Sequence, residues 1–274
     1  MKLGMIGFGN ISTTLLGLLS ENLNEPLESL TVVRLPEFSD SVQDVFETQF
    51  SDVARQFSVV TSAEELLAQR PDLVVECAGH AAVVAHVTPV LRAGTDTIIV
   101  SIGALADAKL EAMVREAAVE GGARLILPAG AIGGIDLLSA LRPAGGLEVQ
   151  YRGTKPPNAW SGTPAEDLLD LDALTEKAVF FSGTAREAAT AFPKNANVAA
   201  TLALAGAGFE ATQAELIADP AAAGNIHEYS VTSPLTRYTL RIENQPSAGN
   251  AKTSVSTVYS VLREITNRIG PVAI

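Results

Sequence analysis

The sequence has a single cysteine, few charged residues and, among those, few basic ones. Cys77 has no other cysteine to pair with, so the fold does not depend on an oxidising compartment. Charged residues make up only 18% of the chain, and 31 Asp and Glu outnumber 19 Lys and Arg. The resulting formal net charge of −12 argues against a nucleic-acid partner, because polyphosphate binding needs a basic surface. It does not exclude a small phosphate-bearing ligand, which backbone dipoles can bind locally.

Long hydrophobic runs are also missing. No stretch reaches the roughly 18 apolar residues that a membrane span needs, and the N-terminus lacks the cationic start and apolar core of a signal peptide. Apolar residues nevertheless make up 47% of the 274 residues, which is ample for a large core and excludes a disordered chain. We therefore expect an α/β protein of the cytoplasm with no membrane partner.

The first half of the chain alternates short apolar segments with helical patterns. Such an order predicts a doubly wound parallel sheet of the Rossmann type, because parallel strands need crossover connections. A capping box, Ser62 with Glu65, marks the start of one helix. Strands are expected at 2–6, 30–35, 58–61, 73–76, 97–101 and 124–127, and helices at 11–19, after Ser62, at 80–93 and at 107–119.

The pattern changes after Pro128, where we place a domain boundary. Residues 1–128 would form the dinucleotide-binding domain and residues 129–274 a substrate-binding, catalytic and dimerisation domain. Period-two segments at 226–231 and 238–242 predict an antiparallel hairpin, hence an α+β domain with a mainly antiparallel sheet. The final helix, at about 253–268, is a candidate to pack back on the first domain.

A glycine turn follows the first strand. Gly7 and Gly9 would let the backbone approach a pyrophosphate, while Asn10 and Ile11 open a helix whose free amides favour an anion. The third position of the dinucleotide fingerprint holds Ser12 instead of Gly or Ala, so the motif is imperfect and looser cofactor packing is expected. An ordinary tight turn is the alternative.

The end of the second strand bears on the choice of cofactor. Arg34 stands where NAD-selective sites place an acid, and a guanidinium suits a 2′-phosphate, so we expect NADP to be accepted and preferred over NAD. Alternatively, Arg34 lies over the adenine and gives little selectivity. Ala78 and Gly79, after the fourth strand, are further cofactor candidates, whereas Cys77 is expected to be a small buried filler.

Among three histidines, His227 is the one that lies beyond the first half. In a strand it shares a face with Asn225, which makes it a candidate general acid/base, although a structural histidine is the alternative. Two further polar segments, 192–197 and 250–254, would present cations and helix-start amides to a dicarboxylate, with simple helix capping as the alternative. The substrate-binding candidates are Lys194, Asn195, Asn225, Lys252 and Thr253. No metal-ligand set is expected.

Several ordered segments together resemble the L-aspartate dehydrogenase family. They are GMIGFGNI (4–11), GAIGGID (130–136), KPP (155–157), FPKNANVAAT (192–201), ADP…NIHE (218–228) and KTS…TVYSVLR (252–263). The resemblance spans essentially the whole chain and implies NAD(P)-dependent oxidation of L-aspartate to iminosuccinate, which hydrolyses to oxaloacetate and ammonia, or the reverse reductive amination. It also implies a homodimer and a role in NAD biosynthesis.

Carried over by motif, the family's catalytic histidine falls on His227, and its contacts near the nicotinamide fall on Ala131 and Asn197. Arg34 occupies a position where some members carry an acid, so the resemblance alone leaves NAD against NADP open. Two rival functions remain: a related two-domain NAD(P)H reductase of another small dicarboxylate or imine, and a non-catalytic NAD(P)-binding sensor. The paired histidines of dihydrodipicolinate reductases are not visible here, which counts against that relative.

Overall fold

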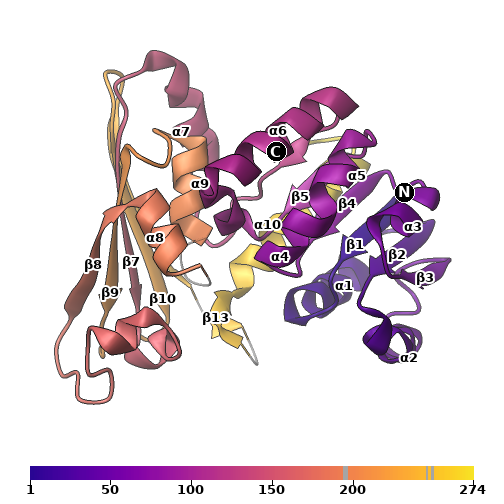
Figure 1. Cartoon of the computed structure of the whole chain (residues 1–274), viewed down its shortest axis with the longest axis horizontal. Coiled ribbons are helices and arrows are strands. Elements are labelled where there is room, and N and C mark those ends of the chain that lie inside the picture. The colour runs from indigo at the N-terminus through magenta and orange to yellow at the C-terminus, as the bar shows by residue number, and fades with distance from the viewer. Residues whose placement is uncertain (194–196, 245, 248–249) are drawn as a thin grey trace. The chain divides into compact units, whose positions relative to one another are not determined.

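The computed structural model describes residues 1–193, 197–244, 246–247 and 250–274; for 246–247 and 250–253 it describes the backbone only. The chain divides into two compact units (Figure 1). The first comprises residues 1–104, 108–128 and 258–274, and the second comprises residues 105–107 and 129–257. No described helix has the length and apolar character of a membrane span.

The first unit is built on a six-stranded parallel sheet in the order β3-β2-β1-β4-β5-β6. The direction of winding reverses between β1 and β4, so the carboxyl ends of these two strands flank the crevice where doubly wound sheets bind ligands. This confirms the predicted Rossmann-type sheet. The strands are β1 (Lys2–Ile6), β2 (Ser29–Val33), β3 (Phe57–Val60), β4 (Leu73–Glu76), β5 (Thr97–Ile99) and β6 (Leu125–Ile126).

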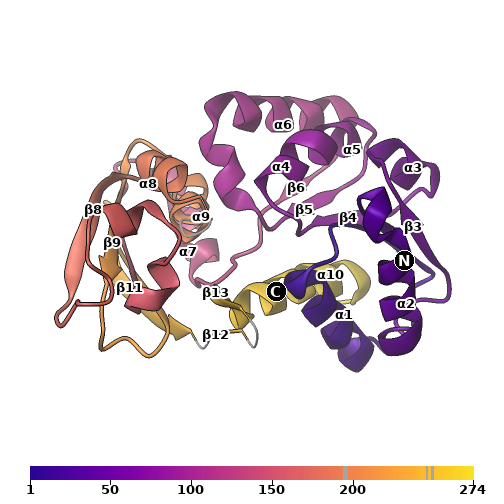
Figure 2. The same cartoon turned by 60° about the horizontal axis from the view of Figure 1, so that its bottom comes forward.

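Helices cover both faces of this sheet. Figure 2 shows α1 and α10 side by side on one face and α4, α5 and α6 on the other. Apolar residues of α10 spaced three and four apart, Val258, Val261, Leu262 and Ile265, enter the same core as Leu3 of β1. The helices are α1 (Asn10–Asn22), α2 (Ser39–Gln49), α3 (Ala63–Ala68), α4 (His80–Ala82), α5 (Thr88–Arg92), α6 (Ala108–Gly121) and α10 (Val255–Ile269).

Three helices differ from the sequence-based expectation. The helix α2 was not expected, and the segment expected as one helix at 80–93 contains a π-helical stretch, Val83–Val87, between α4 and α5. Pro89 explains the interruption, because it supplies no amide proton to the preceding turn. The final helix begins at Val255, not at Thr253, because residues Asn250–Ser254 form the strand β13, which pairs with β12 (Pro246–Ser247).

The second unit is built on a five-stranded sheet in the order β11-β10-β7-β9-β8. The pair β7 and β9 is parallel and the other pairs are antiparallel, which confirms the predicted mainly antiparallel sheet. Helices α7 (Ile135–Leu141), α8 (Ala185–Ala191) and α9 (Asn197–Ala205) lie on one side of it (Figure 1). The strands are β7 (Glu148–Lys155), β8 (Ala178–Thr184), β9 (Thr212–Ala218), β10 (Asn225–Thr232) and β11 (Arg237–Asn244).

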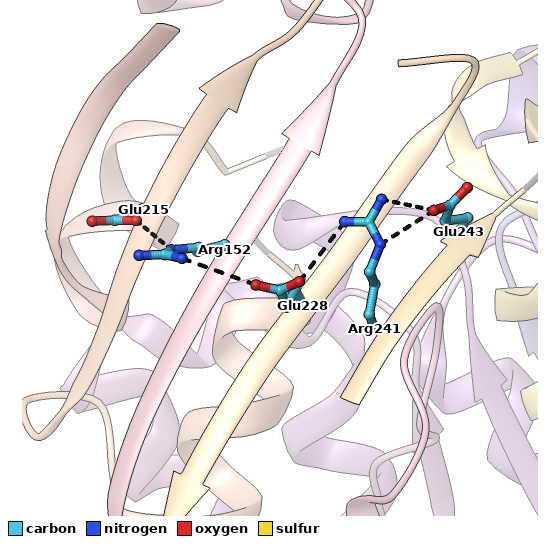
Figure 3. A network of polar contacts seen from close by, with 5 residues as sticks. All are labelled: Arg152, Glu215, Glu228, Arg241 and Glu243. Atoms are coloured by element: carbon cyan, nitrogen blue, oxygen red, sulfur yellow. Dashed lines mark hydrogen bonds and ion pairs between the residues drawn. The ribbon is translucent and has the colours of Figure 1, made fainter. Parts of the chain in front are cut away.

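Successive side chains of β10 alternate between buried and half-buried, as expected for a sheet with one covered face. The covered face, here called the inner face, carries His227, whereas the outer face carries Glu228. Figure 3 shows an ion-pair ladder on the outer face, in which Glu228 lies between two arginines. Short 3-10 turns lie at Pro36–Phe38, Ile102–Ala106, Arg142–Ala144, Pro157–Trp160 and Pro164–Asp167.

Candidate functional site

The glycine turn after β1 has the geometry that a pyrophosphate site requires. Gly7 has a φ of +96°, and a Cβ placed there would lie 2.6 Å from the Cβ of Ala78. Glycine is therefore needed both for the backbone conformation and for the close approach of the β1 and β4 strand ends. Gly9 is the N-cap of α1, and Asn10 and Ile11 form its first turn, where backbone amides favour an anion.

Ser12 forms hydrogen bonds within this turn. Its side chain is fully buried, and its hydroxyl donates to the Gly7 carbonyl at 3.1 Å and accepts from the Gly9 amide at 3.3 Å. The same oxygen lies 3.0 Å from the Cys77 sulfur. The hydroxyl thus holds the loop together from within. Burial raises the pKa of the Cys77 thiol to about 12, which favours the thiol over the reactive thiolate at neutral pH.

A buried carboxylate shapes the turn after β4. Glu76 is fully buried and accepts hydrogen bonds from the amides of Ala78 and Gly79 at 2.9 and 2.8 Å, and from the amide and hydroxyl of Ser101 at 3.0 and 2.9 Å. Burial raises its pKa, and these four donors oppose that shift. Sequence reasoning missed Glu76; the signal was an acid at the end of an otherwise apolar strand.

Arg34 follows β2 at the same edge of the sheet. Its backbone amide donates to the Val60 carbonyl, and its guanidinium lies over the Phe38 ring, 4.8 Å from the centroid. The Nε atom is buried and has no hydrogen-bond partner within the described residues. A guanidinium donor held on an aromatic face and left unpaired suits a phosphate ligand. Together with the glycine turn, it makes this unit fit a nicotinamide dinucleotide.

His227 lies on the inner face of the second unit's sheet. Its side chain is only 3% exposed, and its Nδ1 atom lies 2.8 Å from the hydroxyl of Tyr151 on the neighbouring strand β7. Burial, followed by the positive charge of Lys155, lowers the pKa of His227 to about 3. The imidazole is therefore neutral at physiological pH and able to accept a proton.

Lys155 is a buried polar residue of this face that sequence reasoning did not select as a site residue. It ends β7, is 3% exposed, and places its ammonium 5.1 Å from the centre of the Trp160 ring. A buried cation next to a buried imidazole is rare in a purely structural core, and perturbed pKa values of this kind cluster at functional sites. The KPP segment indicated the position but not the electrostatic effect of Lys155 on the histidine.

Buried amides connect the loop at 129–134 to the same face. The Asn244 side chain donates to the Ala131 carbonyl at 2.9 Å and accepts from the Ser256 hydroxyl at 2.6 Å. Asn225, opposite Asn244 on β10, donates to the Ser254 hydroxyl at 3.3 Å. The structure thus brings Ala131 and Asn225 into the polar surroundings of this strand pair, and Asn244 is a further residue that sequence reasoning missed.

The remaining predicted site residues are less informative. Asn197 is the first residue of α9, and its carbonyl accepts from the Thr201 hydroxyl. Lys194 and Asn195 lie outside the described residues. The backbone of Lys252 and Thr253 belongs to β13, and their side chains are not among those described. Among the described residues, no cluster of His, Cys, Asp and Glu could hold a metal ion.

Two family models match the chain, one in its N-terminal part and one in its C-terminal part. Residues 7–128 match the family model described as the NAD-binding domain of homoserine dehydrogenase. Residues 136–268 match the model described as the C-terminal part of aspartate dehydrogenase. The first match supports a nicotinamide cofactor, and the second covers the strand that carries His227.

Individual proteins match over most or all of their length. The L-aspartate dehydrogenase of Cupriavidus necator is 44% identical over 275 residues, covering 100% of both chains. That of Ruegeria pomeroyi is 51% identical over 219 residues, covering 79% of this chain and 80% of its own. Among solved structures, the aspartate dehydrogenase of Thermotoga maritima superposes with a TM-score of 0.74 at 28% identity, covering 100% of this chain and 99% of its own.

Proposed function

The chain belongs to the L-aspartate dehydrogenase family, a family of nicotinamide-dependent oxidoreductases, and from this premise we propose the reaction and the residue that moves its proton. L-aspartate loses a hydride from its α-carbon and a proton from its amine, which gives iminosuccinate. Water then adds to the imine carbon and ammonia leaves, which gives oxaloacetate. The reverse sequence is a reductive amination, and a nicotinamide cofactor, when bound, would accept the hydride in one direction and supply it in the other.

In this proposal His227 is the general acid/base. It is the buried, neutral imidazole of the second unit, and its Nδ1 atom is engaged by Tyr151, so Nε2 is the atom that exchanges a proton. In the oxidative direction Nε2 accepts a proton from the amine or from the water that attacks the imine, and in reverse it returns that proton. Asn225 and the segments that contain Lys194, Asn195, Lys252 and Thr253 are proposed to hold the two carboxylates.

The reaction is tested by omission. The purified protein should consume NADPH or NADH only when oxaloacetate and ammonium are both present, and should form NADPH or NADH from L-aspartate in the other direction. Consumption without ammonium would contradict the aminating reaction and would favour a reductase of another substrate. Cofactor binding without turnover under any of these conditions would favour the sensor.

We further propose that NADP is accepted and preferred through Arg34. Its guanidinium lies over Phe38 with an unpaired Nε, so a 2′-phosphate would gain a charge-assisted hydrogen bond there. Arg34→Ala should raise the Michaelis constant for NADP by roughly tenfold or more, consistent with about 1.5–3 kcal/mol for a hydrogen bond to a charged group, and should change that for NAD little. Thr61→Ala, in the loop after the neighbouring strand β3, serves as the control. An unchanged ratio of the two constants in Arg34→Ala would contradict this preference.

The family resemblance also leads us to propose a homodimer that acts in the cytoplasm. Light scattering during size-exclusion chromatography should give about twice the 28.5 kDa mass of one chain. A monomeric mass at micromolar concentration would contradict the dimer.

A further inference from the structure

The strand β7 carries a glycine where its neighbours on the inner face carry large side chains. Gly153 lies directly opposite His227 in the antiparallel pairing of β7 with β10, and Tyr151 lies directly opposite Tyr229. Tyr151 is therefore diagonal to His227, two positions away along the strand. Such diagonal neighbours meet only when the longer side chain leans along its strand.

Tyr151 leans in this way because Gly153 leaves room for its ring. A Cβ at position 153 would lie 2.5 Å from the Tyr151 hydroxyl oxygen and 3.0 Å from its Cζ atom. Gly153 does not have a positive φ, so its backbone conformation is open to any residue. The side-chain space above Gly153 is what excludes a larger residue, and the phenol occupies that space to reach the Nδ1 atom of His227 at 2.8 Å.

The contact occupies the Nδ1 atom of His227. Tyr151 is 1% exposed, and burial raises the pKa of its phenol, so the group stays neutral and keeps its proton. For Nε2 to accept a proton, the neutral ring must carry its own proton on Nδ1, and this N–H then donates to the Tyr151 hydroxyl oxygen; the hydroxyl accepts the same bond from the neutral and from the charged ring. Nδ1 is therefore engaged in every protonation state, and Nε2 is left to exchange the proton.

We infer that Tyr151, given room by Gly153, is a positioning residue that holds the His227 imidazole with Nε2 directed to the substrate. This inference rests on the proposed role of His227 and deepens it. Tyr151 itself transfers no proton to the substrate. Its role is to keep the ring from rotating and from exchanging its two nitrogens between protonation events.

The test replaces the hydroxyl and keeps the ring. In Tyr151→Phe we expect kcat to fall about ten- to a hundredfold, which is less than the roughly 10²–10⁴-fold that acid–base catalysis itself contributes, with little change in the Michaelis constant for the cofactor. The second readout is the ¹⁵N spectrum of the imidazoles, which is tractable because the chain has three histidines. The Nδ1 and Nε2 shifts of His227 should move, because Nδ1 loses its partner.

Tyr229→Phe is the matched control for the spectrum. Tyr229 is the other fully buried tyrosine of this face, and its hydroxyl donates to the Gly133 carbonyl, not to the histidine. Its removal should leave the His227 shifts unchanged. Gly153→Ala is the second variant, since its methyl group would displace the phenol without removing any polar group. It should move the same shifts, and its effect on kcat should shrink in the Tyr151→Phe background because both changes break one contact.

Two outcomes separate this inference from the proposed function. If the His227 shifts and kcat are both unchanged in folded Tyr151→Phe, or if the effects of Tyr151→Phe and Gly153→Ala on kcat simply add, the positioning role is overturned. If the shifts move as expected but a His227 variant retains the wild-type kcat, the contact stands and the catalytic role of His227 is what fails.

Discussion

The two faces of the second unit's sheet differ in how they surround ionisable side chains: those of the inner face are buried, and those of the outer face are exposed and paired with opposite charges. On the inner face, His227 is 3% exposed and is paired with one phenol, and burial alone is the main cause of its lowered pKa. On the outer face, the adjacent Glu228 is 33% exposed and lies between Arg152 and Arg241 at 4.0 and 3.8 Å (Figure 3). One residue along β10 thus separates a neutral buried base from a solvated charge.

This difference in burial indicates a different role for each face. Burying an ionisable group without an opposite charge costs free energy in its charged form, so it is retained where its neutral form is useful. Exposed ion pairs cost little and contribute little, because water screens them. We therefore expect changes on the inner face to alter chemistry and changes on the outer face to alter stability slightly.

The largest expected effect comes from replacing His227 by glutamine, with the same replacement of its neighbour Glu228 as the control. His227→Gln should lower kcat about 10²–10⁴-fold, because glutamine can hydrogen-bond but cannot accept and return a proton. Glu228→Gln, one position further on, should leave kcat within about twofold, because its side chain faces the other side of the sheet. The measurement is steady-state kinetics in the aminating direction. Near wild-type turnover in folded His227→Gln would remove the functional distinction between the faces.

The second effect concerns the charge that faces His227 within the inner face. The positive charge of Lys155 lowers the pKa of His227, so Lys155→Met should raise that pKa from about 3 toward its ordinary value, by about one unit. The recovery is partial, since burial is the larger cause. His227 must be unprotonated to act as a base, so the acid limb of the pH profile of kcat/KM should move to higher pH.

Direct titration of the His227 resonances checks the same shift without turnover, and Lys177→Met, an exposed lysine just before β8, is the control. A His227 pKa that falls in Lys155→Met would reverse the sign of the effect assigned to Lys155.

The sequence predicts those features of the fold and site that depend on neighbouring residues, but not those that depend on contacts between distant segments. Alternation with period two predicted the hairpin and put Asn225 and His227 on one face, because side-chain direction in a strand is a local property. The parallel sheet of the first unit followed from the order of its segments. By contrast, the approach of Tyr151 to His227 depends on the register of β7 against β10, which is set by residues 76 positions apart.

Other errors also have non-local causes. Residues 250–254 were expected to open the last helix, since Asn, Ser and Thr favour N-caps, but they form β13 and the helix starts at Val255. The segment forms a strand because it pairs with β12, and this pairing cannot be seen in the sequence of residues 250–254 alone. Asn244 escaped notice because it is one asparagine at the end of an exposed strand, and only the fold shows that it bridges Ala131 and Ser256.

The smallest expected effect lies on the outer face. Glu228 is directly opposite Arg152 on one side and Arg241 on the other, and Arg152 is directly opposite Glu215 on β9, at 2.7 Å. Opposite charges paired across strands contribute roughly 0.2–1 kcal/mol each, and exposure keeps the sum near the lower end. Glu228→Gln should therefore lower the free energy of unfolding by about 0.5–1 kcal/mol, measured by urea denaturation.

The salt dependence of that loss sharpens the comparison. Because exposed charges are screened within about 10 Å at 0.1 M salt, most of the loss should disappear in high salt. Glu243→Gln, at the open edge of the ladder with a side chain 67% exposed, should cost less than Glu228→Gln at every salt concentration. A loss above about 2 kcal/mol that persists in high salt would contradict a solvated outer face, because only charges withdrawn from water escape screening. The ladder would then lie within an interface between copies of the chain, and the two faces of the sheet would be buried alike.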